Sequence, residues 1–301
     1  MKRALILSAF VSILILFAGC IITDDSLDYR NDLSDHEVKK IVRTVLLSQN
    51  SINRAGLITS DGLENLVRRN SRYYNDNRLE CSDGGYLTFT LFDDNFAITL
   101  ETETPLHIDY YECLYAPLYY DASRLDGGMN IIYHQHTEDS YEKLLDFSIE
   151  YLDTYLYSSG TTIRIDGKLG VHYDEDYLRH QLALVFSANR LEIENRTYYD
   201  KDIFTNIVLE YHIDTNTYAY RYSYSGTLYN SYFGRLTFST LTPMEGYGNH
   251  NPRIGRFKIS NAHINLLVIP QDDYYVDIIV ENHYYPSRNH TIHTTWLNIG
   301  L

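Results

Sequence analysis

Histidines are the first residues to consider for chemistry, because imidazole serves both acid–base catalysis and metal binding. The chain has 12 of them. Those that fall close together form two groups: His134 with His136, and His290 with His293 and His283. Zinc needs three or four ligands, and each group has one close pair. We therefore expect no metal site and no cofactor, and interpret these histidines as exposed residues of strand edges.

Paired carboxylates are the chemistry of glycoside hydrolysis, which requires two of them about 5–10 Å apart. The acidic runs at 174–176 and 272–273 would serve only if the fold brought partners together, and their composition is typical of turns. No Gly-x-Ser-x-Gly, His-Glu-x-x-His or phosphate-binding glycine loop occurs in the sequence. We assign no catalytic residues. A periplasmic carbohydrate-active hydrolase is the alternative to a binding or structural role.

Cys20 follows a segment with the composition of an export signal. Lys2 and Arg3 form a basic start, and the apolar run 4–17 is shorter than the roughly 20 residues of a membrane-spanning helix. The small pair Ala18-Gly19 stands directly before the cysteine. An uncleaved membrane anchor and a simple secretory signal are the alternatives to cleavage at this cysteine.

The motif that ends at Cys20 resembles the lipobox of bacterial lipoproteins, with Phe17 where that family usually has Leu, Val or Ile. The resemblance implies that residues 1–19 are a signal peptide and that Cys20 is lipidated and becomes the first residue of the mature chain. Several acyl chains hold a protein on a membrane essentially permanently. Ile21 follows the cysteine. In enteric bacteria an Asp there retains lipoproteins in the inner membrane, so the sequence favours the outer membrane.

Two cysteines remain beyond Cys20, namely Cys81 and Cys113. One remaining pair in an exported chain predicts a single disulfide, and the alternatives are two free thiols or a metal pair. The bond would close a loop of about 30 residues, which the chain-entropy model values at about 3–4 kcal/mol.

The charge and the tyrosine content bear on partners. A formal charge of −15 repels phosphate backbones and argues against nucleic acid. The 30 tyrosines, many of them in doublets, suit strands that place one ring on each face. They serve either as ordinary sheet residues or as an aromatic surface for a glycan or an envelope protein.

The first elements of the mature chain are helical. Ser34 and Glu37 form a capping box, and the apolar positions that follow predict an amphipathic helix to about residue 48. A second short helix is expected from about Asp61. We assign 20–33 to an acidic, flexible, lipid-anchored tether and 34–75 to a helical cap that packs on the sheet or plugs an open end.

Strand patterns occupy 76–301. The motif Arg124-Leu125-Asp126-Gly127 recurs as Arg164-Ile165-Asp166-Gly167, with a looser third copy around Gly226, and we expect these glycines to mark bends or bulges. Strands are also expected at 96–100, 234–240 and 256–259, with a long loop at 242–254. The pattern predicts a mainly β fold: a curved antiparallel meander or a partly open barrel-like sheet with a small N-terminal helical cap.

The lipobox, the Cys-x-x-Gly-Gly motif and the Asp-Gly strand starts together resemble uncharacterised β-rich lipoproteins of Gram-negative bacteria. The matching residues are Cys81, Gly84, Gly85, Cys113, Asp126 and Gly127. The resemblance implies location and β architecture and brings no catalytic residues. We therefore expect a lipid-anchored, periplasm-facing protein of the cell envelope, held by its N-terminal lipid, with a binding or structural role and a glycan or envelope protein as partner.

Overall fold

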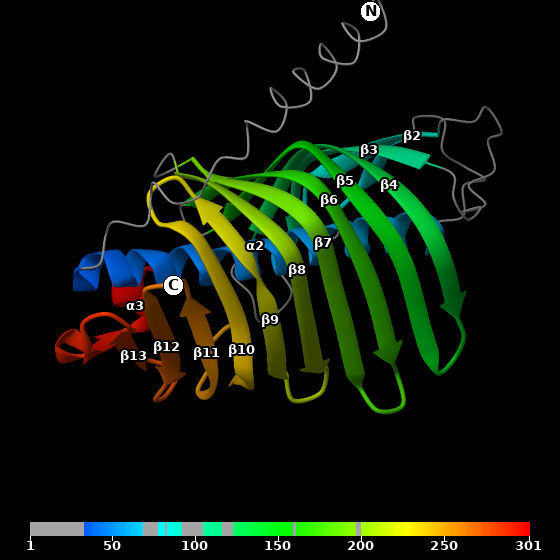
Figure 1. Ribbon diagram of the computed structural model, residues 1–301. Helices are drawn as coiled ribbons and strands as arrows, with labels where there is room; N and C mark the ends of the chain where they lie inside the picture. Colours follow the sequence, from blue (N-terminus) through cyan, green and yellow to red (C-terminus); the bar gives the residue numbers. More distant parts are fainter. Residues whose placement is uncertain are drawn as a thin grey trace, which may run out of the picture.

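The chain folds as one open sheet curled around one long helix (Figure 1). The computed structural model describes residues 33–68, 78–81, 83–91, 105–115, 123–158, 161–196 and 200–301. Within these ranges fourteen antiparallel strands follow each other in sequence order, and the first and last are not joined. This confirms the predicted curved meander. The signal, Cys20 and nearly all of the tether lie outside the described residues.

The strands lengthen toward the middle of the sheet and shorten again toward its end. Their bounds are β1 (Arg78–Glu80), β2 (Tyr86–Leu91), β3 (Pro105–Tyr115), β4 (Ser123–Glu138), β5 (Glu142–Ser158), β6 (Thr161–Asp176), β7 (Gln181–Asn195), β8 (Asp200–Asp214), β9 (Ala219–Asn230), β10 (Gly234–Tyr247), β11 (Ile254–Ser260), β12 (Ile264–Pro270), β13 (Tyr275–Asn282) and β14 (His290–Thr295). The 3-10 turn η2 (Pro286–Arg288) and the short helix α3 (Trp296–Ile299) complete the chain.

The helix α2 (Asp35–Arg68) begins where the sequence predicts. The Ser34 backbone N–H donates to Glu37 Oε2 at 2.8 Å, and the Glu37 N–H donates to Ser34 Oγ at 3.4 Å, which confirms the capping box. The expected break between two helices is wrong, because the helix runs on without interruption. Polar residues in its second half bond to their own backbone: Thr59 Oγ1 donates to Ala55 O and Ser60 Oγ to Gly56 O, both at 2.8 Å.

This helix crosses the strands on the concave side of the sheet rather than capping an end (Figure 1). Near its start, Tyr232 OH after β9 donates to Glu37 Oε1 at 2.8 Å. Near its other end, a Cβ at Gly62 would meet Leu87 of β2 at 3.2 Å. A helix of 34 residues is about 50 Å long, which is about ten strand spacings. The helix is therefore long enough to cross most of the fourteen strands.

Two glycines let the helix lie close to the sheet. A Cβ at Gly56 would stand 2.1 Å from Phe186 Cε1 of β7, and one at Gly62 would stand 2.5 Å from Tyr110 Oη of β3. Both aromatic side chains are almost completely buried. From Ser51 to Leu63 the helix is buried on nearly all sides, and small residues there alternate with buried Ile and Leu side chains.

The predicted bends are confirmed as bulges in neighbouring strands. Gly127 of β4 (φ 109°) and Gly167 of β6 (φ 120°) both lie at shifts of strand register. Two further residues have positive φ angles: Asp153 (φ 57°) in β5, which lies between β4 and β6, and Asn206 (φ 51°) in β8, beyond β6. Bulges bend a strand and increase its twist, so this row curls the sheet around α2.

Three further predictions concern a loop, a strand and the disulfide. The expected loop at 242–254 is too long, because β10 continues to Tyr247 and pairs with β9 beyond a register shift at 239–244. The expected strand at 96–100 lies outside the described residues. The predicted disulfide is present: Cys81 and Cys113 are bonded, with their Cα atoms 5.5 Å apart and a sequence separation of 32. It joins the start of the meander to β3.

Replacement of Gly56 by alanine tests the close approach of helix and sheet. Gly→Ala inside a helix normally stabilises by up to about 1 kcal/mol. Here the new methyl group meets Phe186, which is fully buried, so we expect Gly56→Ala to lower the free energy of unfolding by about 1–3 kcal/mol instead. Urea unfolding followed by circular dichroism measures it. Asn50→Ala, at an exposed position of the same helix, is the control and should not destabilise.

Candidate functional site

The side of α2 that the sheet leaves open carries a groove of about 360 Å³. One wall is the stretch of α2 from Leu46 to Arg54, and the other consists of β8, β9 and the turn at 248–252. Trp296 of α3 and Ile163 of β6 close its ends. We call this feature the amide groove, because side-chain amides are concentrated on its helical wall.

The amide side chains of the helical wall have hydrogen-bonding capacity that contacts within the protein do not use. Gln49 and Asn53 are only 3% and 4% exposed, and Asn50 beside them is exposed. Within the described residues Gln49 makes no side-chain hydrogen bond, and Asn53 Oδ1 has no partner. Buried amides in folded proteins are nearly always hydrogen-bonded, so these groups retain capacity to bind a ligand.

Tyrosines form the opposite wall. The rings of Tyr211, Tyr220 and Tyr222 lie nearly parallel, with centroids 5.6 to 6.3 Å apart. Tyr220 OH donates to the backbone carbonyl of His250 at 2.6 Å and so fixes the turn at 248–252. Burial raises the pKa of Tyr222, so its hydroxyl stays neutral. The wall is thus rigid, aromatic and uncharged.

The groove contains no carboxylate side chain among the described residues that line it. Its charged side chain is the guanidinium of Arg54, which donates to Ser123 Oγ at 3.1 Å. The lining of the groove therefore does not support chemistry that needs a pair of carboxylates. It supports hydrogen bonding to a polar, uncharged ligand.

A second depression, on the outer side of the sheet, does collect carboxylates. It has about 430 Å³ and is lined by Asp174, Asp176, Asp214 and Glu245 together with His212. Backbone N–H groups, first that of Thr217, donate to Asp214 and lower its pKa. Desolvation lowers the pKa of His212. The carboxylates with a resolved pKa shift, Asp139, Glu150, Asp153 and Asp214, all have a lowered pKa, whereas a general acid requires a raised one.

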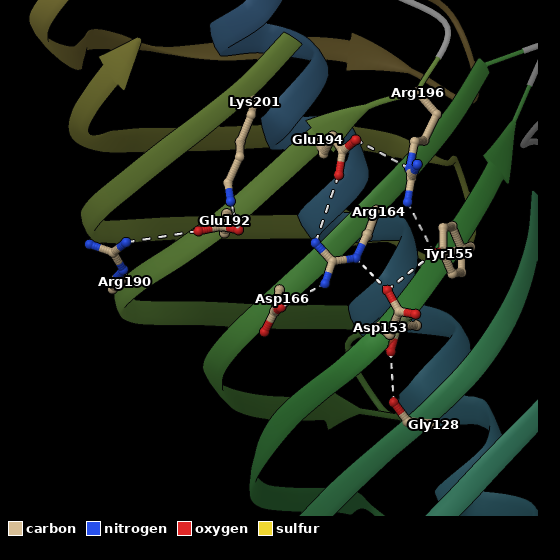
Figure 2. A network of polar contacts seen from close by, with 11 residues as sticks. Gly128, Asp153, Tyr155, Arg164, Asp166, Arg190, Glu192, Glu194, Arg196 and Lys201 are labelled. Atoms are coloured by element: carbon tan, nitrogen blue, oxygen red, sulfur yellow. Dashed lines mark hydrogen bonds and ion pairs between the residues drawn. The ribbon is translucent and has the colours of Figure 1, made fainter. Parts of the chain in front are cut away.

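The outer face of β5 to β7 carries a closed network of polar contacts (Figure 2). Arg164 Nε bonds to Asp153, and Arg164 Nη1 lies 3.7 Å from Glu194. Glu194 pairs with Arg196 at 3.3 Å, Arg196 donates to Tyr155 OH, and Tyr155 OH donates back to Asp153 at 3.1 Å. Every member has protein partners, so the network joins strands beside the row of bulges and does not form a ligand site.

The histidines of the sequence analysis have protein partners rather than metal geometry. His290 Nε2 lies 3.1 Å from Asp35, His293 Nδ1 lies 2.7 Å from Asp277, and His134 Nε2 lies 3.1 Å from Ser148 Oγ. The His283 ring bonds to Ala262 O, and the side chain of His136 lies outside the described part. Across the described ranges no three His, Cys, Asp or Glu residues are placed to hold a metal ion.

Comparisons with known proteins add nothing to these contacts, because no protein family, no curated protein and no solved structure matches the chain. Among the described helices, none is both long and apolar enough to cross a membrane. Gln49, Asn50 and Asn53 were not predicted as site residues, because the first helix was expected to end at about residue 48. The spacing of Gln49 and Asn53 is the signal that could have found them, since it places both amides on one face of a continuous helix.

Removal of the Asp153 charge tests the outer network. Arg164 lowers the pKa of Asp153, so the folded state favours the carboxylate, and the stabilisation is present above the ordinary carboxyl pKa of about 4. It is lost as pH falls through the lower folded-state pKa. The side chain is 63% exposed, so we expect Asp153→Asn to cost less than about 1 kcal/mol near neutral pH.

The cost of Asp153→Asn should disappear in acid, and urea unfolding at both pH values measures it. Asparagine is chosen because it tolerates the positive φ of this position. Asp174→Asn, at a carboxylate without a hydrogen bond or ion pair to another described residue, is the control. A cost that persisted in acid would contradict a role for the charge.

Proposed function

We propose that this chain is a lipid-anchored binding protein of the bacterial cell envelope, and that the amide groove binds a polyhydroxylated ligand of the glycan class. The observation that carries the proposal is the pair of buried amides, Gln49 and Asn53, with unused hydrogen-bonding capacity on the wall of a groove of about 360 Å³. A site of this size with a few convergent polar groups is typical of small-ligand binding.

The chemistry of the groove matches hydroxyl groups. A side-chain amide presents a donor and an acceptor side by side, which suits neighbouring hydroxyls of a sugar. The opposite wall adds the hydroxyls and ring edges of Tyr211, Tyr220 and Tyr222, and aromatic side chains supply apolar contact with a polar tip. The absence of carboxylate side chains among the described lining residues favours a ligand without basic groups.

The hydrolase alternative lacks corresponding support. Glycoside hydrolysis requires a protonated carboxyl group opposite a second carboxylate, and the general acid has a raised pKa. The carboxylates of the outer depression include Asp214, whose pKa is lowered by backbone hydrogen bonds. The concave interior, which could have held a substrate, is occupied by α2. Binding is therefore the better-supported function.

The anchor follows from the sequence of the first twenty residues. Fourteen residues, 20–33, would separate the lipid on Cys20 from the start of α2, and an extended segment of this length reaches at most about 50 Å. A tether of that reach lets the groove face the periplasm while the lipid stays in the membrane. Ile21 in place of an aspartate favours the outer membrane.

Labelling of expressing cells with a fatty-acid analogue tests the anchor. The wild-type protein should carry the label, and Cys20→Ser should lose it because the thioether cannot form on a hydroxyl. Cys113→Ser, which retains Cys20, is the control for loss of a cysteine as such. Label that persisted in the Cys20→Ser protein would overturn the lipoprotein assignment.

Binding of a neutral oligosaccharide tests the groove. Trp296 is the one tryptophan of the chain and lines the amide groove, so its fluorescence should change when a probe such as chitotriose is added. Gln49→Leu keeps the volume but removes the amide, and should weaken binding about tenfold, the value of one or two lost hydrogen bonds. Gln135→Leu, exposed and outside the groove, should bind as the wild type does. Equal affinity of the two variants would contradict the site.

A further inference from the structure

The amide groove continues toward the start of α2 as a second groove of about 370 Å³. The two share Leu47, Ile163 and Gly300 in their walls, so they are neighbours on the same helix. The second groove is lined on the helical side by His36, Lys39, Lys40 and Arg43, and on the other by the ends of β6 to β8 and by α3. We call it the basic groove.

Its charge is opposite to that of the chain as a whole. The chain carries a formal charge of −15, yet three fixed cations, Lys39, Lys40 and Arg43, meet a single carboxylate, Asp202, among the described lining residues. Asp202 is 4% exposed and accepts a hydrogen bond from Asn230 Nδ2 at 2.5 Å. Its carboxylate is therefore hydrogen-bonded to the neighbouring strand β9. A walled groove with an excess of one sign of charge concentrates ligands of the other sign.

The three cations are held in different ways. Lys40 Nζ lies 5.6 Å from the centroid of the Tyr232 ring and 5.9 Å from that of Phe233. Arg43 packs against the backbone of Gly300, where an added Cβ would stand 2.9 Å from its Nε. Lys39 forms no ion pair or hydrogen bond with the described residues. Lys39, a half-buried residue, is therefore a cation of the basic groove with which a ligand can pair.

We infer that the ligand of the joined grooves is a phosphorylated oligosaccharide, with its phosphate at Lys39 and Arg43 and its sugar rings at Gln49 and Asn50. The inference rests on the proposed function, to which it adds the charge and the length of the ligand. Positions 43 and 50 are separated by about 10 Å of helix rise, so the ligand extends over more than one sugar ring. Phosphate is matched by a guanidinium and an ammonium, which form strong charge-assisted hydrogen bonds.

Calorimetry on the full chain with three probes tests the inference: chitotriose, chitotriose bearing one phosphate monoester, and inorganic phosphate. The phosphorylated trisaccharide should bind at least about tenfold more tightly than the neutral one, and the difference should shrink as salt is added. Lys39→Gln should remove this difference, because the variant lacks the ammonium that pairs with the phosphate. Lys258→Gln, at a half-buried lysine of β11 outside both grooves, is the matched control.

The outcomes separate this inference from the proposed function. Equal affinities for the two trisaccharides would overturn the inference and leave the function standing. Failure of both to bind would remove the function, and the inference with it. Inorganic phosphate that bound as tightly as the phosphorylated trisaccharide would show that the sugar is not recognised, and would overturn the joined site.

Competition distinguishes a saccharide phosphate from a lipid headgroup. The phosphorylated trisaccharide is bound first, and vesicles of phosphatidylglycerol or of phosphatidylcholine are then added. Retention of the trisaccharide in the presence of both vesicles supports a phosphorylated saccharide as the ligand. Displacement by phosphatidylglycerol and not by phosphatidylcholine would assign the basic groove to an anionic headgroup and overturn the saccharide.

Discussion

The contact between α2 and the concave face of the sheet is the interaction on which the rest of the structure depends. An antiparallel sheet with one apolar face must cover that face, and in this chain a single helix covers it. The cover works because Gly56 and Gly62 leave room for Phe186 and Tyr110, which would otherwise hold helix and sheet apart. The second half of α2 consequently contains glycines and hydroxyl residues, which weaken a helix in water and are tolerated inside the sheet.

The curvature of the sheet is the counterpart of that contact. Bulges at Gly127, Asp153, Gly167 and Asn206 fall in neighbouring strands and turn the sheet around the helix. Two of these positions hold residues other than glycine at positive φ, which costs energy that surrounding contacts must offset. At Asp153 the contact is visible, because its carboxylate accepts from Arg164 and Tyr155 on the outer face. Bending and surface ion pairing thus occur at the same place.

The sequence predicted the β meander, the bulges and the disulfide because each has a local signature. Strand alternation, Asp-Gly pairs and a remaining pair of cysteines are readable without knowledge of the contacts. The continuous helix was not predictable in the same way, since the run Ser48-Gln49-Asn50-Ser51 normally ends a helix in water. Only the tertiary surroundings, which bury Ser51 and allow its hydroxyl to bond to Leu47 O, favour continuation. The same error hid the candidate site, because Gln49 and Asn53 share a face only if the helix does not break.

The polar side chains of the outer face and those of the proposed binding surface along α2 differ in how far protein contacts satisfy them. On the outer face, Arg164, Glu194 and Arg196 form a closed set of ion pairs, so a ligand would have to displace contacts that already exist. Along the open side of α2, Gln49 and Lys39 are held in a groove wall without a hydrogen bond or ion pair to another described residue. A protein gains no stability from such groups, because their burial carries a desolvation cost that a hydrogen bond would have repaid. A bound ligand would recover that cost, and this is the physical reason for the proposal that the grooves along α2 bind a ligand.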